Sequence, residues 1–297
     1  MGGLTTLSGF EYVAPTDLTA AATALRDAGG RACVLAGGTD ILVQLREGMR
    51  SADLVIDVKK IPELLQLEYA PDAGLCLGAA TPCYQIYTTA DVVNAYPALV
   101  DATRIIGGWQ IQSRASVGGN LCNSSPAADS IPPLLVHQAV CHLAGPEGRR
   151  SIPVSDFCTA PGKNSLQPGE LLATLTLPPQ PANAGSAYQR FIPRNEMDIA
   201  VASAASWIEL DDSRSAIKSA RIALGAVAPT PVLAEEASQF LVGKAPTEEN
   251  FSEAGVLARQ VASPIDDMRG TVEFRVHLAG VLTQRTLALA HQRVQDN

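Results

Sequence analysis

The stretch SVGGNLCNSSPAAD, residues 116–129, is the most informative part of this chain. Its paired glycines predict a turn and expose backbone N–H groups, while Asn120, Ser124 and Ser125 add neutral hydrogen-bonding groups. Asp129 ends the stretch and can accept a hydrogen bond from a sugar-like hydroxyl. The stretch therefore predicts a site for a polar, hydroxylated ligand. The alternative is a polar connection with an Asx-turn and a helix cap at Ser125 or Asp129.

A second glycine pair lies upstream in VLAGGTDI, residues 34–41. The apolar run 32–35 predicts a short buried strand, and Ile41 begins a helical pattern that Thr39 or Asp40 could cap. Glycines at a strand–helix junction let backbone N–H groups approach an anion closely, and a diphosphate fits such a junction. The alternative is a tight turn that needs positive φ.

Hydrophobic patterns outside the two loops indicate a mixture of strands and helices. We expect strands at 53–58, 75–79, 139–144, 171–177, 198–210 and 216–227, and helices from Pro82, at 96–106, 231–241, 247–262 and 271–293. Residues 145–148 and 211–215 read as turns. The segment PPQPANAG, residues 178–185, is rich in Pro, Ala and Gly and is the best candidate for a linker.

Composition limits the classes of protein that this chain can belong to. Its 297 residues predict two domains of roughly 150 residues each. A formal charge of −8 argues against nucleic acid as the main partner, because phosphate binding needs a basic face. A content of 46% apolar residues excludes a disordered chain, yet no run of about 18 apolar residues predicts a membrane span.

The cysteines and the first residues bear on the cellular compartment. The six cysteines form no CxxC pair, which is typical of reduced thiols in a cytoplasmic protein. Residues 1–10 show no basic segment followed by an apolar run, so we expect no signal peptide, although Gly2 and Thr6 fit a loose myristoylation pattern. We therefore expect a cytoplasmic protein.

The sequence contains none of the common nucleotide or hydrolase motifs. GxGxxG, GxxxxGK[ST] and GxSxG are all missing from it. The four histidines have no metal-like spacing and no neighbouring Cys or Asp that would suggest a triad. We therefore expect no catalytic residue for substrate chemistry and no metal ligand in this chain.

Taken in order along the chain, several segments resemble one family, the FAD-binding medium subunits of molybdenum hydroxylases, relatives of xanthine dehydrogenase and aerobic carbon monoxide dehydrogenase. The matching segments are AGGTDILVQLREG (36–48), IGGWQIQSRASVGGNLCNSSPAADSIPPLL (106–135), GKNSLQPGELLATLTLP (162–178), RFIPRNEMDIAVASAA (190–205), ARIALGAVAPTPVLAEEA (220–237) and DDMRGTVEFRVHLAGVLTQR (266–285). Several ordered matches are much more specific than one glycine-rich loop.

The resemblance implies an α+β fold with two domains. Residues 1–180 would form an FAD-binding domain of the vanillyl-alcohol oxidase (PCMH) type, with two subdomains that meet near residue 60. Residues 181–297 would form a domain like the C-terminal domain of the carbon monoxide dehydrogenase flavoprotein, with a three-stranded antiparallel sheet and helices.

The resemblance also implies a set of cofactor-binding residues. They are Val34, Leu35, Ala36, Gly37, Gly38, Thr39, Asp40, Ile41, Gly107, Ser116, Val117, Gly118, Gly119, Asn120, Ser124, Asp129, Leu172 and Arg190. Residues 34–41 would hold the FAD diphosphate, Gly107 would lie near the flavin, Asp129 would hold a ribose or ribityl hydroxyl and Leu172 would lie near the adenine. Arg190 stands where relatives often have Lys, near the flavin ring; the alternative for Arg190 is a surface salt bridge.

By the same resemblance, the chain would be an oxidoreductase subunit that transfers electrons through FAD. It would receive them from [2Fe-2S] clusters of a small partner subunit, pass them to an external acceptor, and assemble with a large molybdopterin-binding subunit as a dimer of heterotrimers. Two alternatives are a self-contained FAD oxidase or dehydrogenase and an assembly module that has lost FAD. The short segment after the linker argues against the first, and the intact glycines of both loops argue against the second.

Overall fold

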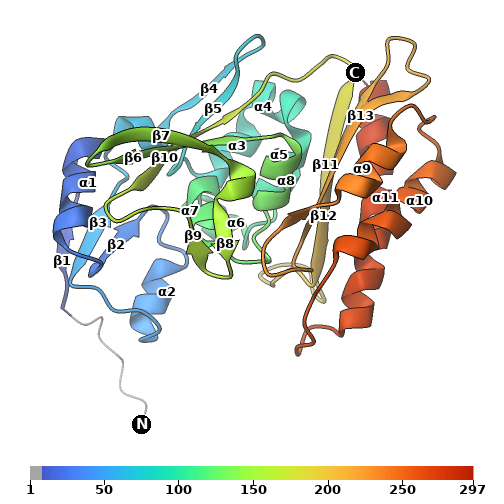
Figure 1. The fold of residues 1–297 in the computed structure, drawn as a ribbon. Helices are drawn as coiled ribbons and strands as arrows, with labels where there is room; N and C mark the ends of the chain where they lie inside the picture. Colours follow the sequence, from blue (N-terminus) through green and yellow to red (C-terminus); the bar gives the residue numbers. More distant parts are fainter. Residues whose placement is uncertain (1–8, 297) are drawn as a thin grey trace.

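A computed structural model of the chain describes residues 9–296 and places three larger sheets in succession along the sequence (Figure 1). Gly2, Thr6 and most of the segment considered for a signal peptide lie outside these residues. Within residues 9–296, no helix is both long and apolar enough to cross a membrane. All six cysteines carry free thiols.

The first sheet is parallel and small. Its strands are β1 (Glu11–Val13), β2 (Ala32–Leu35) and β3 (Leu54–Asp57), in the order β1-β3-β2. Helix α1 (Leu18–Asp27) connects β1 to β2 and begins where the Asp17 side chain accepts the N–H of Ala20. Helix α2 (Ile41–Arg46) follows β2, as predicted, but its N-cap residue Asp40 makes no capping hydrogen bond.

The second sheet is antiparallel and is formed by five strands within residues 67–177. They are β4 (Leu67–Ala70), β5 (Gly74–Gly78), β6 (Val140–Gly145), β7 (Gly148–Pro153) and β10 (Leu171–Leu177), in the order β4-β5-β10-β6-β7. The short helices between β5 and β6 are α3 (Cys83–Thr88), α4 (Ala90–Ala95), α5 (Pro97–Thr103), α6 (Trp109–Gln112), α7 (Val117–Asn123) and α8 (Ile131–Val136). Smaller elements are η1 (Pro62–Leu65), η2 (Val154–Asp156) and the hairpin of β8 (Cys158–Ala160) and β9 (Lys163–Asn164). Apolar side chains of this sheet and of the helices form the largest core cluster.

The third sheet is antiparallel and has helices packed on it. Its strands are β11 (Ala184–Phe191), β12 (Ala202–Leu210), β13 (Ile217–Gly225) and β14 (Val232–Leu233), followed by α9 (Glu235–Leu241), α10 (Glu248–Ala258), η3 (Arg259–Val261) and α11 (Val272–Asp296). Helices α9 to α11 lie on the outer side of the sheet, and α5 and α8, which belong to the helices between β5 and β6, contact it from the other side (Figure 1). Because it is covered on both faces, β12 is a nearly continuous buried run.

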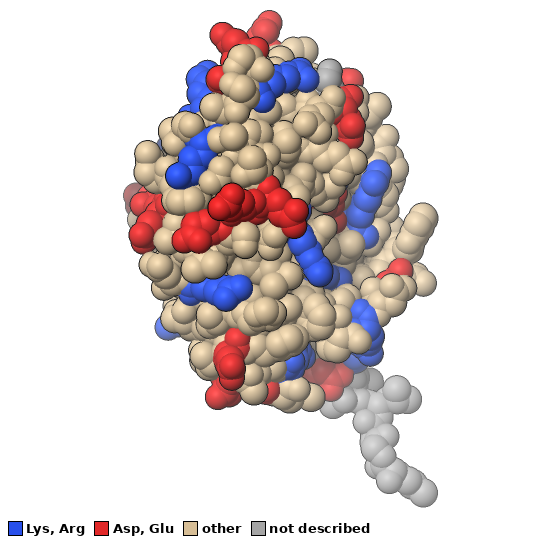
Figure 2. Space-filling view, turned by 90° about the vertical axis from the view of Figure 1, so that its right-hand side faces the viewer, with Lys and Arg blue, Asp and Glu red and all other residues tan. Residues whose placement is uncertain are grey.

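The outer face of the molecule mixes both signs of charge. Figure 2 views the structure from the side of α9 to α11 and shows basic side chains in small separate groups, with acidic groups between them. This face therefore presents no continuous basic field of the kind that phosphate backbones select.

The sheet topology confirms a mixed α/β architecture with antiparallel sheets, and it corrects three local predictions. The C-terminal sheet has four strands instead of three, because residues 232–233 pair with β13 before helix α9 begins. The expected linker is shorter than 178–185, because β11 starts at Ala184 and Gly185 is buried against α11. Pro82 is the residue before helix α3 and not its first residue.

The glycine pair at 118–119 was expected in a turn, but it lies inside helix α7. The hydroxyl of Ser116 accepts the N–H of Gly119 and starts the helix. A Cβ atom on Gly118 would lie 2.4 Å from the carbonyl oxygen of Ala79. Gly118 therefore serves close backbone packing, which local turn propensity does not reveal.

Candidate functional site

A cavity of about 490 Å³ lies where the first and second sheets meet, and both glycine loops line it. The predicted site residues in its lining are Val34, Ala36, Gly37, Gly38, Thr39, Asp40, Ile41, Ser116, Gly118, Gly119, Asn120 and Leu172. The structure thus brings together twelve residues from three separate parts of the sequence. One part is strand β2 and the loop after it, the second is the start of helix α7 with the residue before it, and the third is strand β10.

The two loops meet because Gly37 has no side chain. A Cβ atom on Gly37 would lie 2.0 Å from the carbonyl oxygen of Arg114, which is far inside van der Waals contact. Gly38 has φ of +81°, a conformation that favours glycine. The two glycines of the first pair are therefore required for different reasons. Gly37 permits the close approach of residues 114–116, and Gly38 permits the positive φ of the turn.

The first loop presents a row of unused backbone donors to the cavity. Among residues 9–296, no backbone carbonyl accepts the N–H groups of Gly37, Gly38, Thr39 or Asp40. Successive N–H groups that converge on one concave surface bind anions, and phosphate groups in particular. This row of donors is the feature that best matches the predicted diphosphate site.

The cavity has little charge of its own to balance an anion. Arg50 is the one basic residue among the described residues that line it. Of the two acids in the lining, Glu170 is paired with Arg150 at 2.7 Å, and burial raises the pKa of Asp40. A bound anion would therefore be stabilised mainly by backbone N–H dipoles.

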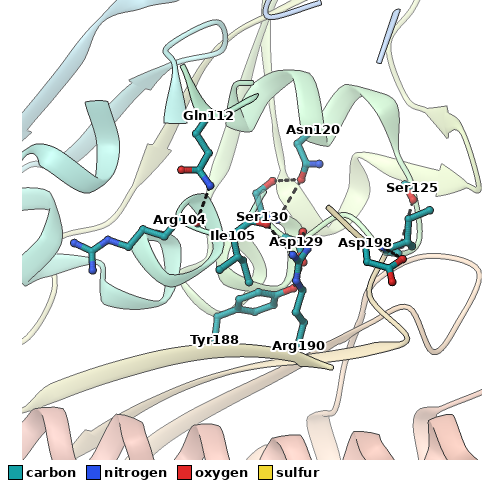
Figure 3. A network of polar contacts seen from close by, with 12 residues as sticks. Arg104, Ile105, Gln112, Asn120, Ser125, Asp129, Ser130, Tyr188, Arg190 and Asp198 are labelled. Atoms are coloured by element: carbon teal, nitrogen blue, oxygen red, sulfur yellow. Dashed lines mark hydrogen bonds and ion pairs between the residues drawn. The ribbon is translucent and has the colours of Figure 1, made fainter. Parts of the chain in front are cut away.

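The second loop contributes a neutral, well-anchored wall. The side-chain oxygen of Asn120 accepts both the N–H of Ser130, at 3.1 Å, and its hydroxyl, at 2.6 Å (Figure 3). With its oxygen used in this way, Asn120 keeps its amide nitrogen as a donor at the cavity.

Asp129 and Arg190 lie together in a buried network beside the cavity (Figure 3). Arg190 donates to the Asp129 carboxylate at 2.6 Å and to the carbonyl oxygen of Ile105 at 2.8 Å, while the hydroxyl of Tyr188 donates to the other carboxylate oxygen at 2.7 Å. Burial raises the pKa of Asp129 to about 6, and Arg190 and Tyr188 counteract this rise. The alternative prediction for Arg190 was a surface salt bridge. Arg190 does form a salt bridge, but the pair is buried and does not lie on the surface.

The remaining predicted residues do not line the cavity in this structure. Leu35 and Val117 turn into apolar cores, and the Ser124 hydroxyl donates to the carbonyl of Leu121. Gly107 has φ of +60° and follows Ile106, which does line the cavity.

Several lining residues had no predicted role. They are Gln44, Arg50, Ala79, Ala80, Cys122, Asn123, Gly162, Asn164, Leu166 and Glu170, together with apolar residues around them. The amide of Gln44 approaches Asn123 at 3.5 Å and so links α2 to α7, while Asn164 donates to the carbonyl of Cys122 at 2.9 Å. Gln44 lies one helical turn after Asp40, so helical spacing from the loop could have indicated it.

The fold and the cavity together define a class of protein, one with a cavity between two sheets that is lined by glycine loops, whose backbone donors suit a phosphate-containing cofactor. The family described as FAD binding domain in molybdopterin dehydrogenase matches residues 8–180, and the family described as CO dehydrogenase flavoprotein C-terminal domain matches residues 186–290. The chain belongs to this family of FAD-binding subunits, which confirms the resemblance seen in the sequence. It is an oxidoreductase subunit whose cofactor is FAD.

Relatives match most of the chain. The xanthine dehydrogenase FAD-binding subunit of Escherichia coli O157:H7 is 33% identical over 261 residues, which are 88% of this chain and 89% of that subunit. The carbon monoxide dehydrogenase medium chain of Afipia carboxidovorans is 29% identical over 287 residues, 97% of this chain and 98% of that one. A solved carbon monoxide dehydrogenase structure from Hydrogenophaga pseudoflava matches with a TM-score of 0.92 and 29% identity, covering 97% of this chain and 99% of that one.

Proposed function

We propose that this chain carries electrons through FAD within a heteromeric molybdenum hydroxylase. A small partner subunit would supply electrons from its [2Fe-2S] clusters, a large subunit would hold molybdopterin, and the assembly would be a dimer of heterotrimers. Two relatives are medium chains of carbon monoxide dehydrogenases, which supports a multi-subunit setting. The observation that carries the proposal is the row of unused N–H donors at the first glycine loop, inside a cavity shared with the second loop.

The proposed contacts follow the cavity. Residues 34–41 would hold the FAD diphosphate, Ser116, Gly119 and Asn120 would bind the cofactor from the second loop, and Leu172 would pack near the adenine. Asp129, Arg190, Gly107 and Ser124 lie outside the lining and stay predicted contacts. When bound, FAD would supply the exchange of electrons, and the chain's own residues would hold it and exclude water.

The proposed organisation has a domain boundary at residues 180 and 181. It assigns residues 1–180 to an FAD-binding domain of the vanillyl-alcohol oxidase type, with subdomains that meet near residue 60. The parallel sheet ends at Asp57 and the antiparallel sheet begins at Leu67, which supports this division. A cytoplasmic location stays a prediction.

Absorption spectroscopy of the purified chain tests the proposal. We expect flavin bands near about 370 and 450 nm, with FAD as the species released on heating. A partner iron–sulfur subunit whose [2Fe-2S] clusters have first been reduced chemically should reduce the bound flavin, whereas small substrates should not. A colourless chain that also fails to bind added FAD would contradict the proposal, and oxidation of a small substrate by the chain alone would favour a self-contained enzyme.

A further inference from the structure

A lysine that belongs to no motif holds the first glycine loop from outside the cavity. The Lys59 ammonium donates to the carbonyl oxygen of Ala36 at 3.0 Å and lies 2.8 Å from a carboxylate oxygen of Asp57. The other carboxylate oxygen of Asp57 accepts the hydroxyl of Tyr12 at 2.6 Å. The ammonium is therefore fixed between a carboxylate and one carbonyl of the loop.

The parallel sheet creates this contact. Leu35 on β2 is in register with Asp57 on β3, and the N–H of Val58 continues the ladder by donating to the carbonyl of Leu35 at 3.1 Å. The carboxyl ends of the two strands thus lie side by side. The next pair along the two strands is Ala36 and Val58. Lys59 follows Val58, and its side chain reaches the Ala36 carbonyl from there.

The contact sets the direction of the next N–H group. A trans peptide is planar, so its C=O and N–H bonds point in opposite directions. Because the Ala36 carbonyl points to Lys59, the N–H of Gly37 points away from it. Ala36 and Gly37 both line the cavity, and no backbone carbonyl within residues 9–296 accepts this N–H.

We propose that Lys59 is a positioning residue that turns the Gly37 N–H toward the cofactor diphosphate. The proposal rests on the proposed function, because it takes FAD as the occupant of the cavity. Lys59 does not itself belong to the described lining of the cavity, whereas its neighbour Val58 does. It acts through the Ala36 carbonyl and not by placing its charge on the phosphates.

Ligand affinity of the full chain, freed of its cofactor, tests this role. Lys59→Met removes the donor to Ala36, and Lys60→Met is the matched control, since Lys60 is the exposed neighbouring lysine. We expect Lys59→Met to weaken both FAD and ADP by about tenfold, as the loss of a charged hydrogen bond predicts, and Lys60→Met to change either affinity by less than about twofold.

The salt dependence of the affinities separates positioning from direct phosphate contact. A cation that touches phosphate contributes to the slope of affinity against salt concentration, and a positioning residue does not. We therefore expect wild type and Lys59→Met to have parallel salt dependences. A flatter slope in Lys59→Met, an unchanged affinity, or an equal loss in Lys60→Met would each overturn the proposal.

A second variant at Lys59 and the binding of the wild-type chain complete the test. If Lys59→Met does not fold, Lys59→Arg tests the same contact, because a guanidinium keeps the charge but changes the geometry at the carbonyl. We expect Lys59→Arg to bind FAD more weakly with an unchanged salt slope, and wild-type affinity would refute the role. A wild-type chain that binds neither FAD nor ADP would instead contradict the proposed function.

Discussion

Arg190 on β11 and Asp129 at the end of the second glycine stretch form an ion pair at 2.6 Å, with side chains that are only 5% and 9% exposed. The pair joins the C-terminal sheet to the segment that follows α7. Arg190 also donates to the carbonyl of Ile105, so one guanidinium holds two segments next to the cavity. The third sheet thereby helps to fix the shape of a site that it does not itself line.

Removing one partner of this pair should destabilise the protein strongly. Arg190→Met would leave the Asp129 carboxylate buried without its counter-charge, and we expect a loss of about 3–5 kcal/mol in the free energy of unfolding. Urea denaturation measures this loss. Arg194→Met is the control, since Arg194 pairs with Asp198 but is 65% exposed, and its change should stay below about 1 kcal/mol. Similar losses in the two variants would contradict the role of burial.

Gly37→Ala should separate the two glycine loops. The new methyl group would lie 2.0 Å from the carbonyl oxygen of Arg114, and backbone atoms must move to relieve the overlap. We expect a loss of about 1–3 kcal/mol in stability, as for other overpacked sites, together with weaker FAD binding. Thermal unfolding and FAD titration measure the two effects.

The control for this variant is Gly9→Ala, because a Cβ atom on Gly9 would meet nothing within 4 Å. Its stability and FAD affinity should equal those of the wild type. Wild-type behaviour of Gly37→Ala would mean that the loops do not approach as closely as the structure shows.

The neighbouring glycines of α7 should respond differently to substitution by alanine. At Gly118 the methyl group would lie 2.4 Å from the carbonyl oxygen of Ala79, so Gly118→Ala should destabilise the chain by about 1–3 kcal/mol. At Gly119 the methyl group would lie 3.0 Å from the Ser116 hydroxyl, which is a slightly tight contact. The cost of this contact is offset because alanine stabilises a helix by about 1 kcal/mol relative to glycine. Gly119→Ala should therefore be near neutral in the free energy of unfolding. An equal loss at both positions would argue against the packing of α7 on residue 79.

His137 should make the protein sensitive to acid. Burial, with the nearby Arg221 charge, lowers the pKa of His137 to about 3, well below the value of about 6.5 expected in the unfolded chain. The unfolded state therefore binds the proton more tightly between these two pKa values. The stability from His137 is complete above pH 6.5 or so and is lost as the pH falls towards 3, at up to about 1.4 kcal/mol per pH unit.

Denaturation of wild type and His137→Leu between about pH 7 and 4 measures this contribution, because the difference between the two curves removes the titration of other groups. We expect the variant to lose less stability on acidification. His277→Gln, at an exposed histidine on α11, should follow the wild-type curve. A variant curve parallel to that of wild type would show that His137 does not carry the acid sensitivity.

Much of the site could be predicted from the sequence because it consists of glycine loops, whose backbone conformation depends on residues next to each other in the chain. Paired glycines at 37–38 and 118–119, a strand before the first pair and a serine before the second are visible in the sequence. Ordered matches along the chain then identified the family. The hairpin of β12 and β13 was also readable, because apolar runs and a polar turn follow each other directly.

The sequence by itself determined the family, the two glycine loops that line the cavity and most of the long strands and helices. Only the tertiary structure decided that Gly118 packs in a helix, that Arg190 pairs with Asp129 inside the protein, and that Lys59 holds the carbonyl of Ala36. These features depend on sheet register and on the close approach of segments distant in sequence, which local periodicity and turn propensity do not encode.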